Sequence, residues 1–189
     1  MPPDSVYRFP SFEYGRVAFA TGFSPEQQLR FNYNLFTGQM DMINSKGDTV
    51  QMNQIKELKF ISIADRLFFH SYKIGYLEIL YQSTVSLGVR NLLIDVDPPM
   101  GGPLHLNGSK SGLYFKNQAF YYFIETDNKI HKATSWAIRK LFHDHEKAVK
   151  VFLNENKIDF EHEDDLIKVL TFCNQLITEA GKNGPTADK

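Results

Sequence analysis

The stretch Gln28-Leu29-Arg30-Phe31-Asn32-Tyr33-Asn34-Leu35 decides the fold class, because apolar and polar side chains alternate in it at every position. Successive side chains of a strand point to opposite faces of a sheet. The alternation therefore predicts a strand with one face on a hydrophobic core and the other in water or against a partner. The same pattern recurs on both sides, at Val17 and Phe19, Met40 and Met42, and Val50 and Met52, with breaks at Gly22, Gly38 and Gly47.

Strands are expected over 14–21, 28–35, 39–43, 49–53, 56–63, 67–72, 76–82, 89–96, 113–116, 119–125 and 130–133, with Asn117-Gln118 as a break. Such short strands, spaced by about ten residues, are typical of antiparallel folds. The gaps between them are too short for the helices that connect parallel strands. We predict an α+β fold: an antiparallel β-meander that forms a curved sheet, a barrel or a sandwich, followed by two to three C-terminal helices.

The helical period begins at Ser135, which is the expected N-cap. One helix is expected over 135–156 with a kink at His143-Asp144, and a second over 163–178, with Gly181 as its stop. The predicted organisation is an N-terminal arm at 1–12 and a single domain at 13–180. Within that domain, 13–133 forms the β body and 134–180 the helical segment, and 181–189 is a disordered tail.

The composition is that of an ordinary globular protein, with 42% hydrophobic and 23% charged residues in a chain of 189. A formal net charge of −1 argues against nucleic acid as an obligatory partner, because polyanions select for a basic surface. No apolar stretch is long enough to span a membrane. The first residues lack the basic and apolar segments of a secretory leader, so we expect none there. The aromatic excess of 14% predicts sheet packing or, alternatively, the lining of a ligand cavity.

The sequence contains no recognisable catalytic motif and no spacing typical of metal ligands. His143 and His145 are two positions apart, so they cannot share one face of a helix as zinc ligands would. Gly108-Ser109-Lys110-Ser111 misses the spacing of a phosphate-binding loop. Cys173 is the single cysteine and falls on an apolar helix face, which indicates a buried structural thiol. We therefore expect no catalytic residues, no metal and no cofactor.

The best candidate for a binding site is the long irregular stretch from Asp97 to Gly112, because long loops in compact domains are often functional. Asp95 and Asp97 point the same way from a strand end. They are either solvated acids or carboxylates that share a cation such as calcium. The residues expected to contact a ligand or partner are Asp95, Asp97, His105, Asn107 and Lys110.

Several short motifs resemble those of a known group of proteins. They are Gly15-x-Val17-x-Phe19, Phe31-Asn32-Tyr33-Asn34 with Gly38-x-Met40, Gly47-Asp48-Thr49, Ile63-x-Asp65-Arg66-x-Phe68 and Tyr76-x-Glu78-Ile79-Leu80. Their order is similar to that in uncharacterised exported β-rich proteins of Bacteroidota, in which Lys-rich helices also follow the β-rich body. The resemblance implies a periplasmic or cell-surface location, with a cytoplasmic one as the alternative. It implies no catalytic or binding residues.

We therefore expect a non-enzymatic binding or assembly protein of the bacterial envelope, with a protein or small molecule as its partner. A carrier of a small hydrophobic ligand, held in a barrel-like cavity, is the first alternative. A metal-dependent hydrolase built around Asp95, Asp97 and a histidine is the second. The oligomeric state is left open.

Overall fold

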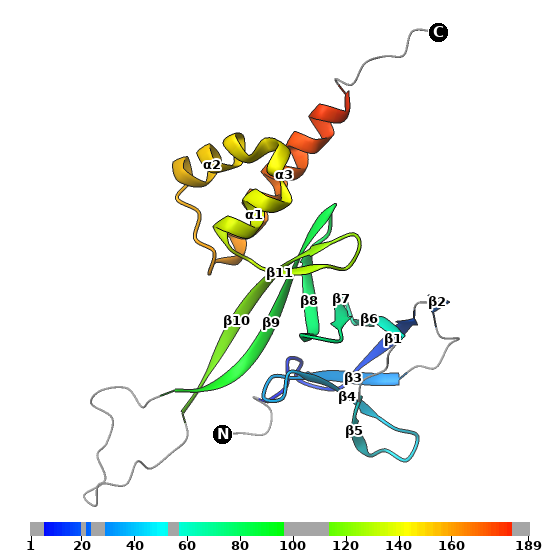
Figure 1. Ribbon diagram of the computed structural model, residues 1–189. Helices are drawn as coiled ribbons and strands as arrows, with labels where there is room; N and C mark the ends of the chain where they lie inside the picture. Colours follow the sequence, from blue (N-terminus) through cyan, green and yellow to red (C-terminus); the bar gives the residue numbers. More distant parts are fainter. Residues whose placement is uncertain (1–5, 20–21, 24–28, 53–56, 97–113, 183–189) are drawn as a thin grey trace, which may run out of the picture. The chain divides into compact units, whose positions relative to one another are not determined.

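A computed structural model describes residues 6–19, 22–23, 29–52, 57–96 and 114–182. It confirms the α+β class, since an antiparallel sheet is followed by helices (Figure 1). The sheet does not close on itself, so of the three predicted forms the open curved sheet is the one observed.

The strands are hydrogen-bonded in the order β11-β10-β9-β8-β7-β6-β1-β3-β4-β5, and β2 pairs with β1 outside this path. Their bounds are β1 Glu13–Phe19, β2 Gly22–Phe23, β3 Leu29–Asn34, β4 Gln39–Ile43, β5 Thr49–Gln51, β6 Leu58–Ile63, β7 Arg66–Ser71, β8 Gly75–Tyr81, β9 Val85–Val96, β10 Tyr114–Glu125 and β11 Ile130–Lys132. Most neighbours in the path follow one another in the chain, as a meander requires.

The chain forms two compact units. The strand unit comprises Met1–Tyr76 with Arg90–Ala119, and the helical unit comprises Leu77–Val89 with Phe120–Lys189. Each unit has its own cluster of buried apolar side chains. The prediction of a single domain over 13–180 stays a prediction.

The core of the strand unit lies on the face that the alternation predicted. Phe31, Tyr33 and Leu35 are all buried, and Phe31 is fully inaccessible. Val17 of β1 pairs with Ile61 of β6, which in turn pairs with Phe68 of β7, so one face of three strands is apolar. Cross-strand pairs of this kind are the elementary contacts that stabilise a sheet.

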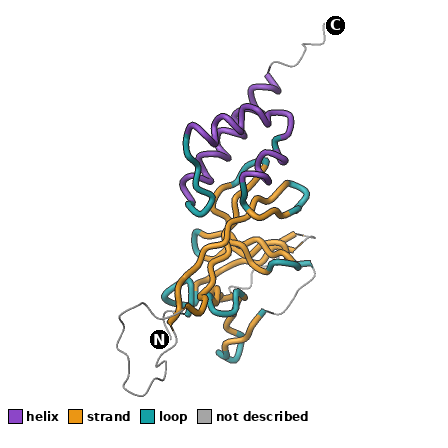
Figure 2. The backbone as a smooth tube through the Cα atoms, turned by 60° about the vertical axis from the view of Figure 1, so that its left-hand side comes forward, coloured by secondary structure: helices purple, strands orange, loops and turns teal. Residues whose placement is uncertain are grey.

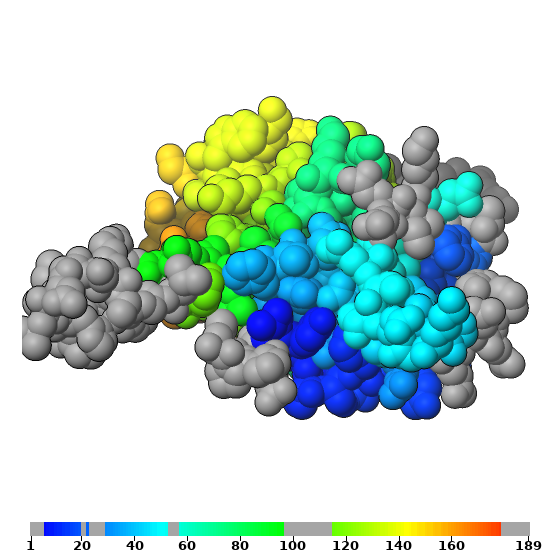
Figure 3. All heavy atoms as spheres, turned by 90° about the horizontal axis from the view of Figure 1, so that it is seen from below, coloured from blue at the N-terminus to red at the C-terminus, as the bar shows by residue number. Residues whose placement is uncertain are grey.

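On the opposite face of β3, Arg30 is exposed but Asn32 is buried, because the N-terminal arm lies beside this part of the strand. Tyr7 forms a bridge with Asn34, and the ladder resumes where Glu13 pairs with Phe31, so residues 9–12 lie opposite Asn32 alone. The Asn32 side chain fills this bulge: it accepts a hydrogen bond from the amide of Phe9 (3.1 Å) and donates to the carbonyls of Phe9 (2.9 Å) and Ser11 (3.0 Å). Asn32 is consequently 1% exposed. Figure 3 shows the arm in dark blue against the lighter blue and cyan strands.

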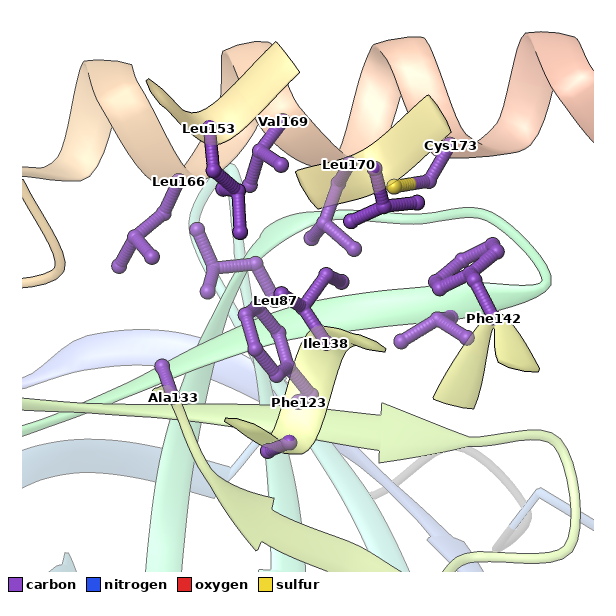
Figure 4. Close-up of a cluster of buried hydrophobic side chains, with 13 residues drawn as sticks. Leu87, Phe123, Ala133, Ile138, Phe142, Leu153, Leu166, Val169, Leu170 and Cys173 are labelled. Atoms are coloured by element: carbon purple, nitrogen blue, oxygen red, sulfur yellow. The ribbon is translucent and has the colours of Figure 1, made fainter. Parts of the chain in front are cut away.

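The helical unit consists of α1 Ser135–Leu141, the 3-10 turn η2 His143–His145, α2 Glu146–Glu155 and α3 Glu163–Lys182, together with the parts of β8, β9 and β10 that belong to it and β11. Figure 2 shows these helices gathered together. Their apolar stripes meet Leu87 and Phe123 of the strands in one core, in which Cys173 is buried as predicted (Figure 4). Burying each large side chain fully stabilises the unit by about 1.5–3 kcal/mol.

Three local predictions were wrong. The N-cap of α1 is Thr134, whose Oγ1 accepts from the amide of Ala137 at 3.1 Å; Thr134 is extended, whereas Ser135 is already helical. Strand β10 continues through Asn117 and Gln118, because pairing in a sheet overrides weak local propensities. Helix α3 continues through Gly181 to Lys182, since glycine ends a helix only where it turns left-handed.

Other local predictions were confirmed. The expected kink at His143-Asp144 is the 3-10 turn η2 between α1 and α2. Helix α2 ends at Glu155, and the chain turns at Lys157 with a φ of 50°. Within the described ranges, no helix combines the length and hydrophobicity needed to cross a lipid bilayer. The remaining parts of the predicted arm and tail, 1–5 and 183–189, lie outside those ranges.

Candidate functional site

The structure places one of the five predicted site residues. Asp95 is exposed near the end of β9, whereas Asp97, His105, Asn107 and Lys110 lie outside the described residues. The loop therefore stays a predicted site. In the part of the chain that the structure describes, no group of three or more His, Cys, Asp or Glu residues is arranged to hold a metal ion.

A different cluster emerges where two turns of the strand unit lie side by side. Residues 35–38 connect β3 to β4, and residues 72–74 connect β7 to β8. A Cβ atom built on Gly75 would be 3.5 Å from the carbonyl oxygen of Gly38, so the start of β8 closely approaches the first turn. We call this region, with the adjoining Arg90 of β9, the two-turn surface.

The guanidinium of Arg90 lies directly against both turns. Its Nη2 atom would be 2.7 Å from a Cβ on Gly38 and 3.8 Å from one on Gly75. Both glycines also have a positive φ, of 68° and 92°. Glycine at these positions therefore serves two purposes, because it allows the turn conformation and lets the backbone approach the Arg90 side chain.

Arg90 carries a donor with no visible acceptor. Its Nε atom is buried and has no hydrogen-bond partner among the described residues. A buried donor without a partner costs about 1–3 kcal/mol, and more when the group is charged, so such atoms are rare in native proteins. The unpaired Nε lies against the first turn, 3.2 Å from the position of a Cβ on Gly38, so the guanidinium is packed between β9 and this turn.

Each of the two turns that lie against Arg90 also exposes a large aromatic side chain. Phe36 is 56% exposed and Tyr72 is 68% exposed. The ring of Phe36 contacts that of Phe115 edge-on, with centroids 5.5 Å apart. Lys73 and Lys116, which follow Tyr72 and Phe115 in the sequence, are also exposed. Aromatic residues and arginine together are the side chains most enriched at the energetic centres of protein interfaces.

A partly buried polar network holds the first turn in place. Asn34 accepts hydrogen bonds from the amides of Phe36 (3.0 Å) and Thr37 (3.1 Å), and donates to Asp41 Oδ2 at 3.0 Å. The same oxygen of Asp41 accepts from the hydroxyl of Tyr7 at 3.1 Å. Burial, together with the charge of Asp41, raises the pKa of Tyr7, so the phenol remains a donor at physiological pH.

Strand β9 is fixed beside this turn by the end of β3. The amide of Leu93 donates to the carbonyl of Leu35 at 2.7 Å, and the hydroxyl of Tyr33 donates to the carbonyl of Asn91 at 3.0 Å. On the second turn, Ser71 Oγ accepts from the amide of Ile74 at 3.3 Å. The turns and Arg90 are thus held by hydrogen bonds that involve rigid strands, as a preformed binding surface requires.

In the helical unit, His131 and Glu125 form a hydrogen-bonded pair. His131 Nε2 and Glu125 Oε1 are 2.8 Å apart, and each side chain is about one-third exposed (34% and 33%). A carboxylate can orient an imidazole as a general base, but such a pair needs a nucleophile or a substrate proton within reach. Across the described residues, no Ser, Thr or Cys side chain is hydrogen-bonded to this imidazole.

Comparisons with family models, with curated proteins and with solved structures found no match. The two-turn surface was not among the sites expected from the sequence. One signal did exist, since Phe36-Thr37-Gly38 and Tyr72-Lys73-Ile74-Gly75 both place an aromatic residue shortly before a glycine at a strand end. The sequence pattern did not indicate that the two turns lie side by side at Arg90.

Proposed function

We propose that this chain is a non-enzymatic binding or assembly protein of the bacterial envelope, and that it contacts its partner through the two-turn surface. One observation carries the proposal: Phe36 and Tyr72 are exposed on two adjoining turns whose glycines both lie against Arg90. Isolated exposed aromatics are common on soluble proteins. Two of them on a rigid frame beside an arginine form the usual composition of an interface centre.

The polar residues near this surface support a role in binding over one in catalysis. Asn34, Asp41 and Tyr7 are committed to one another and to the backbone of the first turn. A general acid or base must instead present its proton or lone pair to a substrate. The network is therefore suited to keeping a surface rigid, which lowers the entropy cost of binding.

The location in the envelope rests on the resemblance of the motifs to exported proteins of Bacteroidota. Fractionation of the native host tests it directly. We expect the protein in the periplasmic or cell-surface fraction, and recovery in the cytoplasmic fraction alone would contradict that location.

Co-purification of partners from the native host tests the surface. We expect a partner to be retained by the wild-type chain and lost from the double variant Phe36→Ser with Tyr72→Ser. Val151 of the helical unit is 53% exposed, so Val151→Ser is a matched loss of one exposed apolar side chain elsewhere. Retention of the same partner by the double variant would overturn the proposal.

The two alternative functions gain no support from a specific observation among the described residues. A barrel-like cavity requires a closed sheet, and this sheet is open. The hydrolase hypothesis depends on Asp97, which lies outside the described ranges, and Asp95 is exposed.

A further inference from the structure

We propose that the N-terminal arm exchanges between two copies of this chain, so that residues 6–9 of each copy pair with β3 of the other. The surface concerned is the half of β3 that the arm covers, and the partner that fits it is the arm of a second copy. This exchange goes beyond the function proposed above and requires no partner at the two-turn surface. Three features carry it: the edge of β3, the side chains that hold the arm, and the exposed bulge that follows it.

The covered half of β3 is a sheet edge that requires a strand. Among the described residues, β1 pairs with β3 from Leu29 to Phe31 and no further. Beyond that point the arm takes over: the amide of Leu35 donates to the carbonyl of Val6 at 2.8 Å, and the carbonyl of Tyr33 accepts from the arm at 2.9 Å. Without the arm these backbone groups would form an open edge, which readily pairs with a strand of another chain.

Side chains of β3, β4 and β7 hold the arm as they would hold a separate peptide. Asn32 accepts from the amide of Phe9 at 3.1 Å and donates to its carbonyl at 2.9 Å. Asp41 Oδ2 accepts from the hydroxyl of Tyr7 at 3.1 Å. The ring of Phe9 contacts that of Phe68 edge-on, with centroids 6.2 Å apart. These groups do not lie on β1, the strand that the arm precedes, so the arm of a second copy can make the same contacts.

Residues 10–12 form the hinge that changes conformation when the arm exchanges. They connect the arm to β1 and, with residue 9, bulge opposite Asn32. Pro10 and Ser11 are exposed, and proline has no backbone N–H that must find a new partner. Straightening this hinge breaks the hydrogen bond from Asn32 to the Ser11 carbonyl, whereas reciprocal exchange restores the hydrogen bonds and ring contact of residues 7 and 9 with the other copy.

Concentration decides which form is populated. A short connection holds the arm beside its own β3 at an effective concentration on the order of 1 mM. The structure shows this closed form, which dilution favours. Because the closed and exchanged forms share most of their contacts, two copies should exchange arms as their concentration approaches that value.

Disulfide trapping tests the exchange, because Tyr7 and Asn34 lie directly opposite each other. Opposed residues of antiparallel strands have Cα atoms within the range of a disulfide. A Tyr7→Cys chain and a size-tagged Asn34→Cys chain are mixed at about 1 mM and oxidised with diamide. We expect a mixed disulfide dimer that links the arm of one chain to β3 of the other. Cys173 is buried in the helical core, so it should not react.

Two controls separate exchange from random collision and test the geometry of the pair. Lys46 is exposed on the hairpin between β4 and β5, whereas Asn34 is partly buried, so random collision favours position 46. Tyr7→Cys mixed with Lys46→Cys should nevertheless give at least about fivefold less mixed dimer. A single chain with both Tyr7→Cys and Asn34→Cys should close an intrachain disulfide at about 10 μM, where the closed form dominates.

The wild-type chain adds a readout that needs no substitution. Light scattering should show a monomer at about 10 μM and a dimer fraction that grows towards about 1 mM. A wild-type chain that stays monomeric at about 1 mM overturns the exchange, as does a mixed-dimer yield at position 34 no higher than at position 46. Failure of the intrachain disulfide to form would refute the pairing of Tyr7 with Asn34 on which the exchange depends.

Discussion

Replacing Asn32 with alanine should detach the N-terminal arm from β3. Asn32 is 1% exposed and makes three hydrogen bonds to the arm: one accepted from the amide of Phe9 and two donated to the carbonyls of Phe9 and Ser11. These bonds replace the ladder where residues 9–12 bulge opposite a single residue of β3. The substitution removes all three at once and leaves three backbone groups to find other partners.

The magnitude follows from the number of bonds. A typical intramolecular hydrogen bond contributes a net ~0.5–1.5 kcal/mol, so three bonds amount to roughly 1.5–4.5 kcal/mol. The arm is only half-buried, and water can reach some of the freed groups, which favours the lower half of that range. We therefore expect Asn32→Ala to lower the free energy of arm opening by about 2–3 kcal/mol.

Hydrogen exchange at the amide of Leu35 measures this opening, because that amide donates to the carbonyl of Val6. At about 1.4 kcal/mol per factor of ten, exchange should accelerate by roughly 30- to 150-fold. Asn44 is the matched control: it accepts from the amides of Lys46 and Asp48, both at 2.9 Å, but in an exposed hairpin. If Asn32→Ala changes the exchange at Leu35 no more than Asn44→Ala does, the assigned role of Asn32 is wrong.

Three further predictions concern single residues. Gly38→Ala should lower the unfolding free energy by more than the ~1 kcal/mol of positive-φ strain, because the new Cβ would also lie 2.7 Å from Arg90 Nη2 and 2.8 Å from Leu92 Cδ2, and both side chains would have to shift. Gly47→Ala is the matched control: its φ is 89° and nothing lies within 4 Å, so it should cost only the strain of ~1 kcal/mol. Equal melting points for the two variants would contradict this. Burial lowers the pKa of His70 below its ordinary value of 6.5 and outweighs the hydrogen bond to the Leu58 backbone, which raises it. The unfolded state therefore binds more protons than the folded state, and the free energy of unfolding should fall as the pH drops below about 6.5. Denaturant titrations at several pH values should show this slope in the wild type and a shallower slope in His70→Gln. Burial raises the pKa of the Cys173 thiol to about 12, so a thiol reagent at pH 8 should label it only after denaturation, and rapid labelling of the native protein would refute its placement in the helical core.

The sequence predicted the fold class because alternation fixes which side of a strand is apolar. Phe31, Tyr33 and Leu35 are buried for this reason. The fate of Asn32 could not be predicted in the same way. Asn32 is buried because an irregular arm pairs with β3. The arm has no hydrophobic periodicity, so its sequence does not predict that it pairs with a strand.

The same limit applies to the candidate site. Local patterns indicated turns at Gly38 and before Gly75, but the register that brings them together is a property of the folded strand unit. Arg90 lies in a strand that is distant in sequence from both β3 and β4, and nothing in its immediate neighbours distinguishes it from an ordinary surface arginine. The prediction instead favoured the long loop after Asp95, because loop length and polar residues are visible in sequence, whereas spatial convergence is not.

Site-specific photo-cross-linking in the native host tests the central claim most directly, namely that the two-turn surface contacts a partner. A photoreactive phenylalanine analogue would replace Tyr72 in one strain and Val151 in another, since both side chains are highly exposed, at 68% and 53%. The account predicts a discrete protein adduct from position 72 that is absent from position 151 and is lost when Arg90 is changed to Gln. A position 72 that yields no adduct above the level of position 151 would contradict it.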